Sequence, residues 1–191
     1  NRIDISRSSV GILPYAGGAL FVTVFDAAGL TIPNATVHIT NSKLTPALDL
    51  TDTTNANGKL QLLDMPPAVE SYHLEVAKSG YSTESTVTPG GAVTNPVKPD
   101  ATVAAQTVTN ISFNIDKVGS IQITSINALC APKSNVGFTV QGDKLIGKDP
   151  NVLKFNQTIT TDPTGKYSLN NLEWDTYKFA LSGITYDIAG T

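Results

Sequence analysis

Apolar and polar residues alternate in several short segments of this chain. Every second residue is large and apolar in residues 20–24, 72–76, 136–140 and 177–181. A period of two places alternate side chains on one face of a β-strand, whereas an amphipathic helix has apolar residues three and four positions apart. The alternation therefore predicts strands with one buried face, and it predicts almost no helix.

Polar segments that contain glycine separate these strands and predict tight turns. In chain order they are Asp26–Gly29, Asn55–Gly58, Ser79–Tyr81 and Asp162–Gly165. Glycine, asparagine and aspartate favour turns because they tolerate or stabilise backbone conformations that other residues avoid. Short strands joined by regular turns are typical of antiparallel β-sandwiches with Greek-key connections, so an all-β, immunoglobulin-like sandwich is predicted.

The same landmarks occur twice in the same order. Asn34 corresponds to Asn135 at a spacing of 135 − 34 = 101 residues, and Gly58–Leu62 corresponds to Gly165–Leu169 at a spacing of 165 − 58 = 107 residues. Repetition at a nearly constant spacing indicates a duplicated unit. The predicted organisation is an N-terminal linker at 1–17, a first sandwich at 18–117, and a second, divergent and incomplete sandwich at 118–191.

The second unit is expected to lack its final strand. In the first unit a closing strand at 108–115 follows Ser79–Tyr81, whereas only residues 184–191 follow the equivalent Ser182–Gly183. A missing strand leaves a sheet edge whose backbone groups invite another strand. The edge is expected to be filled either by residues beyond Thr191 or by a strand from a neighbouring chain.

Composition narrows the range of partners. The net charge is −3 and only 15% of the residues are charged, so no broad basic field attracts nucleic acid or an anionic membrane. No stretch approaches the roughly 18 apolar residues of a membrane-spanning helix, so no membrane segment is expected in this chain. The single cysteine, Cys130, has no basic neighbour in the sequence and is predicted to be a buried or half-buried small residue.

The order of several motifs resembles the carboxypeptidase regulatory-like family, which has a transthyretin-like fold. The motifs are Val24–Gly29, Ile32–Val37, Asn57–Leu60, Leu63–Pro67 and Tyr72–Tyr81. One departure is the four-residue segment Ala68–Ser71, where the family usually has a single glycine. The resemblance implies a sandwich of seven or eight strands that serves secreted and surface proteins as an accessory, spacer or interaction module. It also implies an extracellular or cell-surface location.

The motif residues have structural explanations and none is of a catalytic type. Turn positions without room for a Cβ atom explain the glycines, and a fixed backbone between two strands explains the prolines. These residues are Gly29, Gly58, Gly80, Pro66 and Pro67. Of the two histidines, only His73 has a carboxylate two positions away, and no third zinc ligand is evident. The chain is therefore predicted to be no enzyme and to hold no metal or cofactor.

Two function classes follow from these observations. The leading hypothesis is a structural or adhesive module, a surface stalk or pilus-associated protein that contacts protein or polysaccharide at the cell surface. The alternative is a carbohydrate-binding or accessory domain of a secreted enzyme. Such modules present exposed aromatic side chains, and Tyr167, Trp174 and Tyr177 are the candidates in this sequence.

Overall fold

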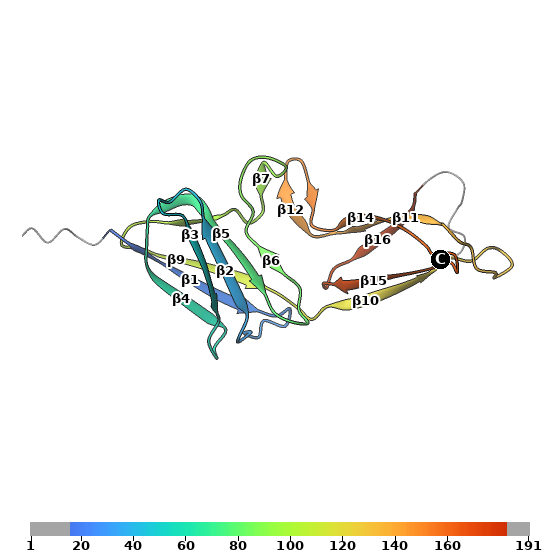
Figure 1. Cartoon of the computed structure of the whole chain (residues 1–191), viewed down its shortest axis with the longest axis horizontal. Coiled ribbons are helices and arrows are strands. Elements are labelled where there is room, and N and C mark those ends of the chain that lie inside the picture. Colours follow the sequence, from blue (N-terminus) through green and yellow to red (C-terminus); the bar gives the residue numbers. More distant parts are fainter. Residues whose placement is uncertain (1–15, 183–191) are drawn as a thin grey trace, which may run out of the picture.

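The computed structural model describes residues 16–182 of the chain. These residues form short strands that gather into an elongated molecule (Figure 1). None of them forms a helix that is long and apolar enough to cross a membrane. The predicted linker at 1–17 lies outside the described residues except for its last two positions.

The first part of the molecule consists of two facing sheets. One sheet contains, in spatial order, β4 (Lys59–Met65), β1 (Gly18–Phe25) and β9 (Val108–Asn114). The other contains β3 (Leu48–Thr53), β2 (Thr36–Asn41), β5 (Ala68–Ala77) and β6 (Glu84–Ser85), and β8 (Ala101–Val103) also pairs with β5. The inward residues of both sheets form one apolar cluster, the first core, in which Leu20, Val22 and Tyr72 are fully buried.

One strand pair departs from the predicted antiparallel pattern. β1 and β4 run antiparallel, but β1 and β9 run parallel over seven residue pairs, from Ala19–Val108 to Phe25–Asn114. Parallel neighbours need a long connection between them, and here the chain crosses the second sheet before it returns as β9. β1 is thus the central strand of its sheet, with both edges paired.

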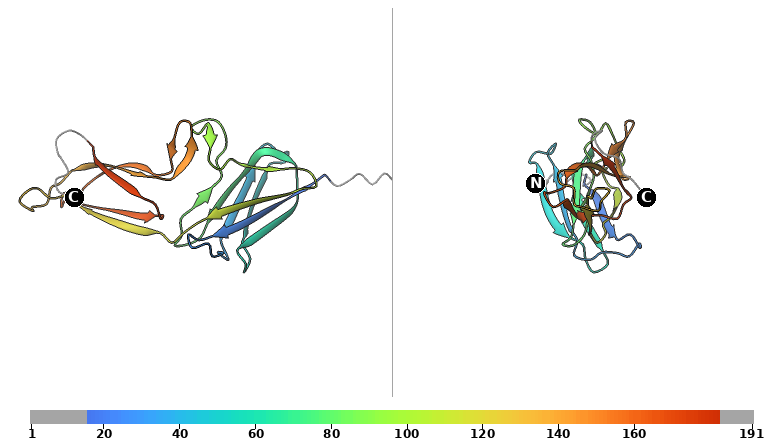
Figure 2. Two further views of the ribbon diagram at one scale, coloured as in Figure 1. Left: turned by 180° about the vertical axis from the view of Figure 1, so that it is seen from behind. Right: turned by 90° about the vertical axis from the view of Figure 1, so that its right-hand side faces the viewer.

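The second part of the molecule is smaller and holds a separate apolar cluster. It contains β10 (Gly119–Thr124) paired with β15 (Lys166–Leu172), and a sheet of β14 (Asn156–Thr160), β11 (Gly137–Gly142) and β16 (Tyr177–Leu181). Val140, Ile159, Leu169 and Leu172 form the second core between them. Figure 2 shows that the two parts follow one another along the long axis.

A small additional sheet lies between the two parts. The hairpin of β12 (Leu145–Lys148) and β13 (Val152–Leu153) extends from the second part, and β12 pairs with β7 (Asn95–Pro96) from the long 86–100 loop of the first part. The sequence of this loop is rich in proline and glycine and shows no strand pattern. The two-residue strand β7 arises because β12 supplies it with a backbone partner.

The strand pairing of the first part recurs in the second. Val22 of β1 lies opposite Leu60 of β4, and Ile123 of β10 lies opposite Tyr167 of β15. Val22 and Ile123 are 123 − 22 = 101 residues apart, and Leu60 and Tyr167 are 167 − 60 = 107 residues apart. These are the same two spacings as in the sequence repeat. In both pairs the register also shifts near the first residue of the opening strand.

A buried threonine recurs at equivalent places in the two parts. The hydroxyl of Thr54 accepts a hydrogen bond from the N–H of Ala35 at 2.9 Å, and the hydroxyl of Thr161 accepts one from the N–H of Val136 at 3.0 Å. Both threonines are only 1% exposed. Each therefore ties the start of one strand to the end of another inside the protein, where an unpaired backbone donor would be costly.

The prediction that Cys130 is buried is wrong, because the residue is exposed. It sits in a turn with a φ of 59°, and Gly29 occupies the corresponding turn of the first part with a φ of 79°. Asp26 and Asn127 each accept two backbone hydrogen bonds at the start of these turns. The turn directs the thiol outward, away from the apolar residues of the second core.

The predicted turn glycines of the first part adopt left-handed backbone. The φ angles are 79° at Gly29, 67° at Gly58 and 78° at Gly80. Gly58 is also crowded, because a Cβ atom there would lie 2.7 Å from the Cβ of Thr31. Pro66 and Pro67 connect β4 to β5, and the carbonyl of Pro66 accepts a hydrogen bond from the hydroxyl of Tyr72.

We expect Gly58→Ala to destabilise the first core by at least about 2 kcal/mol. About 1 kcal/mol comes from a side chain in left-handed backbone, and about 1–3 kcal/mol comes from overpacking. Gly29→Ala is the matched control, because it has a similar φ but nothing within 4 Å of its added Cβ. Chemical denaturation measures both. Equal losses for the two variants would contradict the crowding at Gly58.

Candidate functional site

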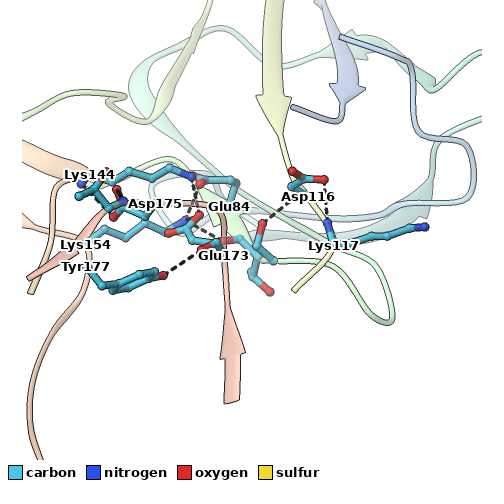
Figure 3. Close-up of polar contacts among 11 residues, drawn as sticks. Glu84, Asp116, Lys117, Lys144, Lys154, Glu173, Asp175 and Tyr177 are labelled. Atoms are coloured by element: carbon cyan, nitrogen blue, oxygen red, sulfur yellow. Dashed lines mark hydrogen bonds and ion pairs between the residues drawn. The ribbon is translucent and has the colours of Figure 1, made fainter. Parts of the chain in front are cut away.

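The most elaborate polar cluster among the described residues lies where the two parts meet. Figure 3 shows Glu84 from the first part facing Lys144, Lys154 and Glu173 from the second. Glu84 belongs to β6, Lys154 lies between β13 and β14, and Glu173 follows β15. We call these four residues the junction cluster.

Lys154 is the centre of the junction cluster. Its ammonium donates hydrogen bonds to a carboxylate oxygen of Glu84, to Glu173 Oε2 at 3.0 Å and to the carbonyl of Thr83 at 3.1 Å. All three donors of the lysine are therefore used, and two of the acceptors belong to the first part. Lys144 donates to the same Glu173 oxygen at 2.9 Å, so the charges alternate along the cluster.

Burial and charge shape the ionisation of the cluster. Burial opposes the ionised form of Glu173, yet hydrogen bonds from Lys144 and Lys154 outweigh it and hold the pKa below its ordinary value. Burial raises the pKa of Tyr177, and the nearby charges of Glu173 and Asp175 raise it further. Glu173 is therefore a carboxylate at neutral pH, with its side chain only 10% exposed.

Backbone pairing reinforces the junction cluster on one side. The N–H of Val97 donates to the carbonyl of Ile146 at 3.0 Å, next to the β7–β12 pairing. Val93 is 7% exposed and lies against Gly147, where an added Cβ would come within 2.5 Å of its Cγ1. The contact therefore depends on a residue without a side chain at position 147.

A buried carboxylate fixes the loop that carries β7. Asp100 is 3% exposed, and its two oxygens accept hydrogen bonds from the hydroxyls of Thr86 and Thr88, each at 2.7 Å. His73 Nδ1 lies 2.9 Å from Asp100 Oδ1. The network joins both ends of the 86–100 loop to the outer face of β5, so β7 is presented to β12 from a fixed base.

Two hollows accompany these networks. One has a volume of about 300 Å³ beside Asp100 and is lined by residues of polar types: Thr40, Ser42, Lys43, Glu70, Ser71, His73, Thr88 and Asp100. A smaller one, of about 190 Å³, lies at the junction beside Lys154 and Tyr177. Over residues 16–182, no group of three or more histidine, cysteine, aspartate or glutamate side chains is placed to hold a metal ion.

The three candidate aromatic residues do not lie in equivalent surroundings. Trp174 is 70% exposed. Tyr167 and Tyr177 are half-buried and pack against the second core, and the ring of Tyr177 meets Phe155 edge to face at 5.4 Å. The hydroxyl of Tyr177 donates to the carbonyl of Glu173 at 3.0 Å. Carbohydrate binding by these residues stays a prediction.

No sequence motif marks the residues that build the junction. Glu84 and Lys154 are separated by 154 − 84 = 70 residues, and neither lies in a motif. Asp100 lies in a segment rich in proline and glycine that indicates only a loop. Of these polar residues, only His73 stood out in the sequence, because a carboxylate lies two positions from it.

Comparison with known families identifies the first part of the chain. The sequence profile of the carboxypeptidase regulatory-like domain matches residues 19–116, which include every strand of the first core. The chain belongs to the carboxypeptidase regulatory-like domain family. The match covers one such domain, which begins at β1 and ends just after β9.

Solved structures offer distant likenesses to the whole chain. The TIE protein of Bacillus anthracis is 16% identical with a TM-score of 0.40, over 92% of this chain and 30% of that one. The shaft pilin SpaA from Lactobacillus rhamnosus GG is 13% identical with a TM-score of 0.33, over 91% of each chain. The streptococcal ancillary pilin is 11% identical with a TM-score of 0.38, over 88% and 54%.

These likenesses carry no inference about function. This chain spans about a third of the TIE protein and about half of the streptococcal pilin. A search of curated protein sequences found no match. The family assignment therefore rests on the carboxypeptidase regulatory-like match over residues 19–116.

We expect Glu173→Gln to lower stability at neutral pH by about 1–3 kcal/mol, because it weakens charged hydrogen bonds from two lysines. A lowered native pKa contributes stability above the unfolded pKa of about 4.3, and this stability is lost as the pH falls through the native pKa. The melting temperatures of variant and wild type should therefore converge in acid.

Asp143→Asn is the control, since the Asp143–Lys178 pair is exposed and is expected to contribute little. Thermal unfolding followed from neutral to acid pH measures both variants. A difference between Glu173→Gln and wild type that stays constant with pH would contradict the role of the Glu173 charge.

Proposed function

We propose that this chain is a non-enzymatic structural module of the cell surface, built from two tandem β-sandwiches that act as a stiff spacer or stalk. The carboxypeptidase regulatory-like domain is the first sandwich, at 18–117. Residues 118–191 are assigned to the second sandwich, which is divergent and incomplete. The observation that carries the proposal is the junction, where side-chain and backbone contacts join two separate cores end to end.

The recurring hydrogen bonds support a duplication. β1, β2, β3, β4 and β5 correspond in order and pairing to β10, β11, β14, β15 and β16. Asn34 and Asn135, 101 residues apart, both have left-handed backbone, with φ angles of 54° and 55°. Agreement in register, in buried threonines and in backbone conformation is more than two unrelated sandwiches need to share.

The junction supports a stiff connection between the two sandwiches. A flexible linker would allow the sandwiches to reorient, as is the default for domains with a small interface. Here the second sandwich begins at Gly119, five residues after β9 ends at Asn114, so the covalent connection is short. The junction cluster and the β7–β12 pairing add contacts on a different segment of chain, which limits bending about that connection.

The chemistry of the described surface supports a role other than catalysis. Beside the 300 Å³ hollow, Asp100 is hydrogen-bonded to His73 and to the hydroxyls of Thr86 and Thr88, and this network holds a loop in place. Partners are proposed to be protein or polysaccharide at the cell surface. The secreted, carbohydrate-binding alternative rests on Trp174, whose exposed ring offers one stacking face.

We expect the double variant Gly147→Ala with Lys154→Met to loosen the connection between the sandwiches. The first change places a Cβ 2.5 Å from Val93, and the second removes the ammonium that bridges Glu84 and Glu173. Nitrogen-15 relaxation should show one rotational correlation time for the wild type and different times for the two sandwiches of the variant.

The matched control is Gly119→Ala with Lys178→Met. A Cβ at Gly119 meets nothing within 4 Å, and Lys178 makes an exposed ion pair inside the second sandwich. This control should tumble like the wild type. The stalk proposal fails if the wild-type sandwiches already tumble independently.

A further inference from the structure

The two opening strands differ in how many partners they have. β1 is paired with β4 on one edge and β9 on the other, whereas β10 is paired only with β15 among residues 16–182. Strand edges present unpaired N–H and C=O groups that another strand can bind. The second edge of β10 is therefore a candidate binding surface for an extended segment.

The direction of the backbone groups identifies which residues face this edge. The N–H of Ser125, directly after β10, donates to the carbonyl of Gly165 on the β15 side at 2.7 Å. Because successive N–H groups of a strand alternate in direction, those of Gln122 and Thr124 point the other way. In β1 the corresponding groups belong to Phe21 and Thr23, on the side where β9 lies.

Side-chain burial also indicates an uncovered site. Leu20 and Val22 of β1 are fully buried, while Ile121 and Ile123 at the equivalent positions of β10 are only half-buried. In the first sandwich β9 adds Phe113, which is fully buried in the core. A strand that places apolar side chains beside Ile121 and Ile123 would bury more apolar surface of the second core, which favours binding.

The chain itself contains a segment with the required pattern. In β9, Ile111 and Phe113 alternate with polar residues, and β9 lies directly before the opening strand β10. Near the N-terminus, Ile3 and Ile5 also alternate with polar residues, and they precede the opening strand β1. Residues 1–6 thus precede the opening strand β1 in the chain, just as β9 precedes the opening strand β10.

The geometry favours a second molecule as the source of this segment. Figure 1 shows that β1 begins at the end of the molecule farthest from β10. If a segment pairs parallel to β10, its C-terminal end emerges at the outer end of the second sandwich. Residues 7–17 then give a connection to the β1 of another molecule that follows along the same axis.

We propose that the edge of β10 that is unpaired among residues 16–182, here called the free edge, binds residues 1–6 of a second copy of this chain, in parallel orientation, so that copies join head to tail. Ile3 and Ile5 of one copy pack beside Ile121 and Ile123 of the next. Because the two contacting surfaces differ, each added copy presents a new free edge and assembly continues. The proposal rests on the duplication stated under the proposed function.

The test is sedimentation velocity of the full chain over a wide range of concentrations. We expect the average mass of the wild type to increase with concentration. Gln122→Pro removes the N–H that faces the free edge and leaves the β15 side intact, since proline is tolerated at edge strands. This variant should associate at least about tenfold more weakly. Gln122→Ala keeps the N–H and should associate like the wild type.

A second variant tests the donor segment without altering the sheet. Ile3→Asp combined with Ile5→Asp should remain monomeric, and circular dichroism and melting temperature should match those of the wild type. A peptide with the sequence of residues 1–7 should cap the wild-type chain and reduce its mass. Association that persists in this double variant, or in Gln122→Pro, overturns the proposal.

A peptide with the sequence of β9, residues 108–116, separates this proposal from the duplication beneath it. If this peptide binds the full chain but the chain stays monomeric at every concentration, the second copy is the wrong occupant and the duplication stands. If the chain is monomeric and the peptide does not bind either, both the proposal and the equivalence of β10 with β1 are wrong.

Discussion

The need to pair both edges of the opening strand governs this structure. β1 lies at the centre of its sheet because β4 satisfies one row of its backbone groups and β9 the other. The pairing brings together residues that are far apart in sequence, and the first core forms between this sheet and its partner. β10 repeats the pairing with β15 but shows a single partner among residues 16–182. Ile121 and Ile123 are only half-buried because no second strand within those residues covers them.

The same constraint explains how the two cores are joined. β9 ends close to the start of β10, so the strand that completes the first sheet also positions the second. The 86–100 loop, fixed by Asp100, carries β7 to β12, and Lys154 connects Glu84 to Glu173 beside it. A short covalent connection and a separate set of contacts together favour a stiff, elongated unit.

The sequence predicts local features of this fold well and long-range pairing poorly. Alternation identified the inward faces of β1 and β5, because a strand with one buried face has an apolar residue at every second position. It did not predict that β9 would run parallel to β1, since register and direction depend on partners elsewhere in the chain. Cys130 was misjudged because its neighbours are apolar, whereas a turn that demands left-handed backbone decides its exposure. The junction cluster was not predicted, because no local pattern marks residues that meet across 70 positions.

Amide hydrogen exchange of the dilute chain tests the central claim, that β10 is an opening strand and that the edge it leaves unpaired among residues 16–182 is free in the molecule. In β1, the amides of Phe21 and Thr23 face β9 and should exchange as slowly as those of Leu20 and Val22, which face β4. In β10, the amides of Ile121 and Ile123 should exchange slowly, and those of Gln122 and Thr124 should exchange rapidly. Gln122 and Thr124 amides as protected as those of Phe21 and Thr23 would contradict the account, because a strand would already occupy that edge.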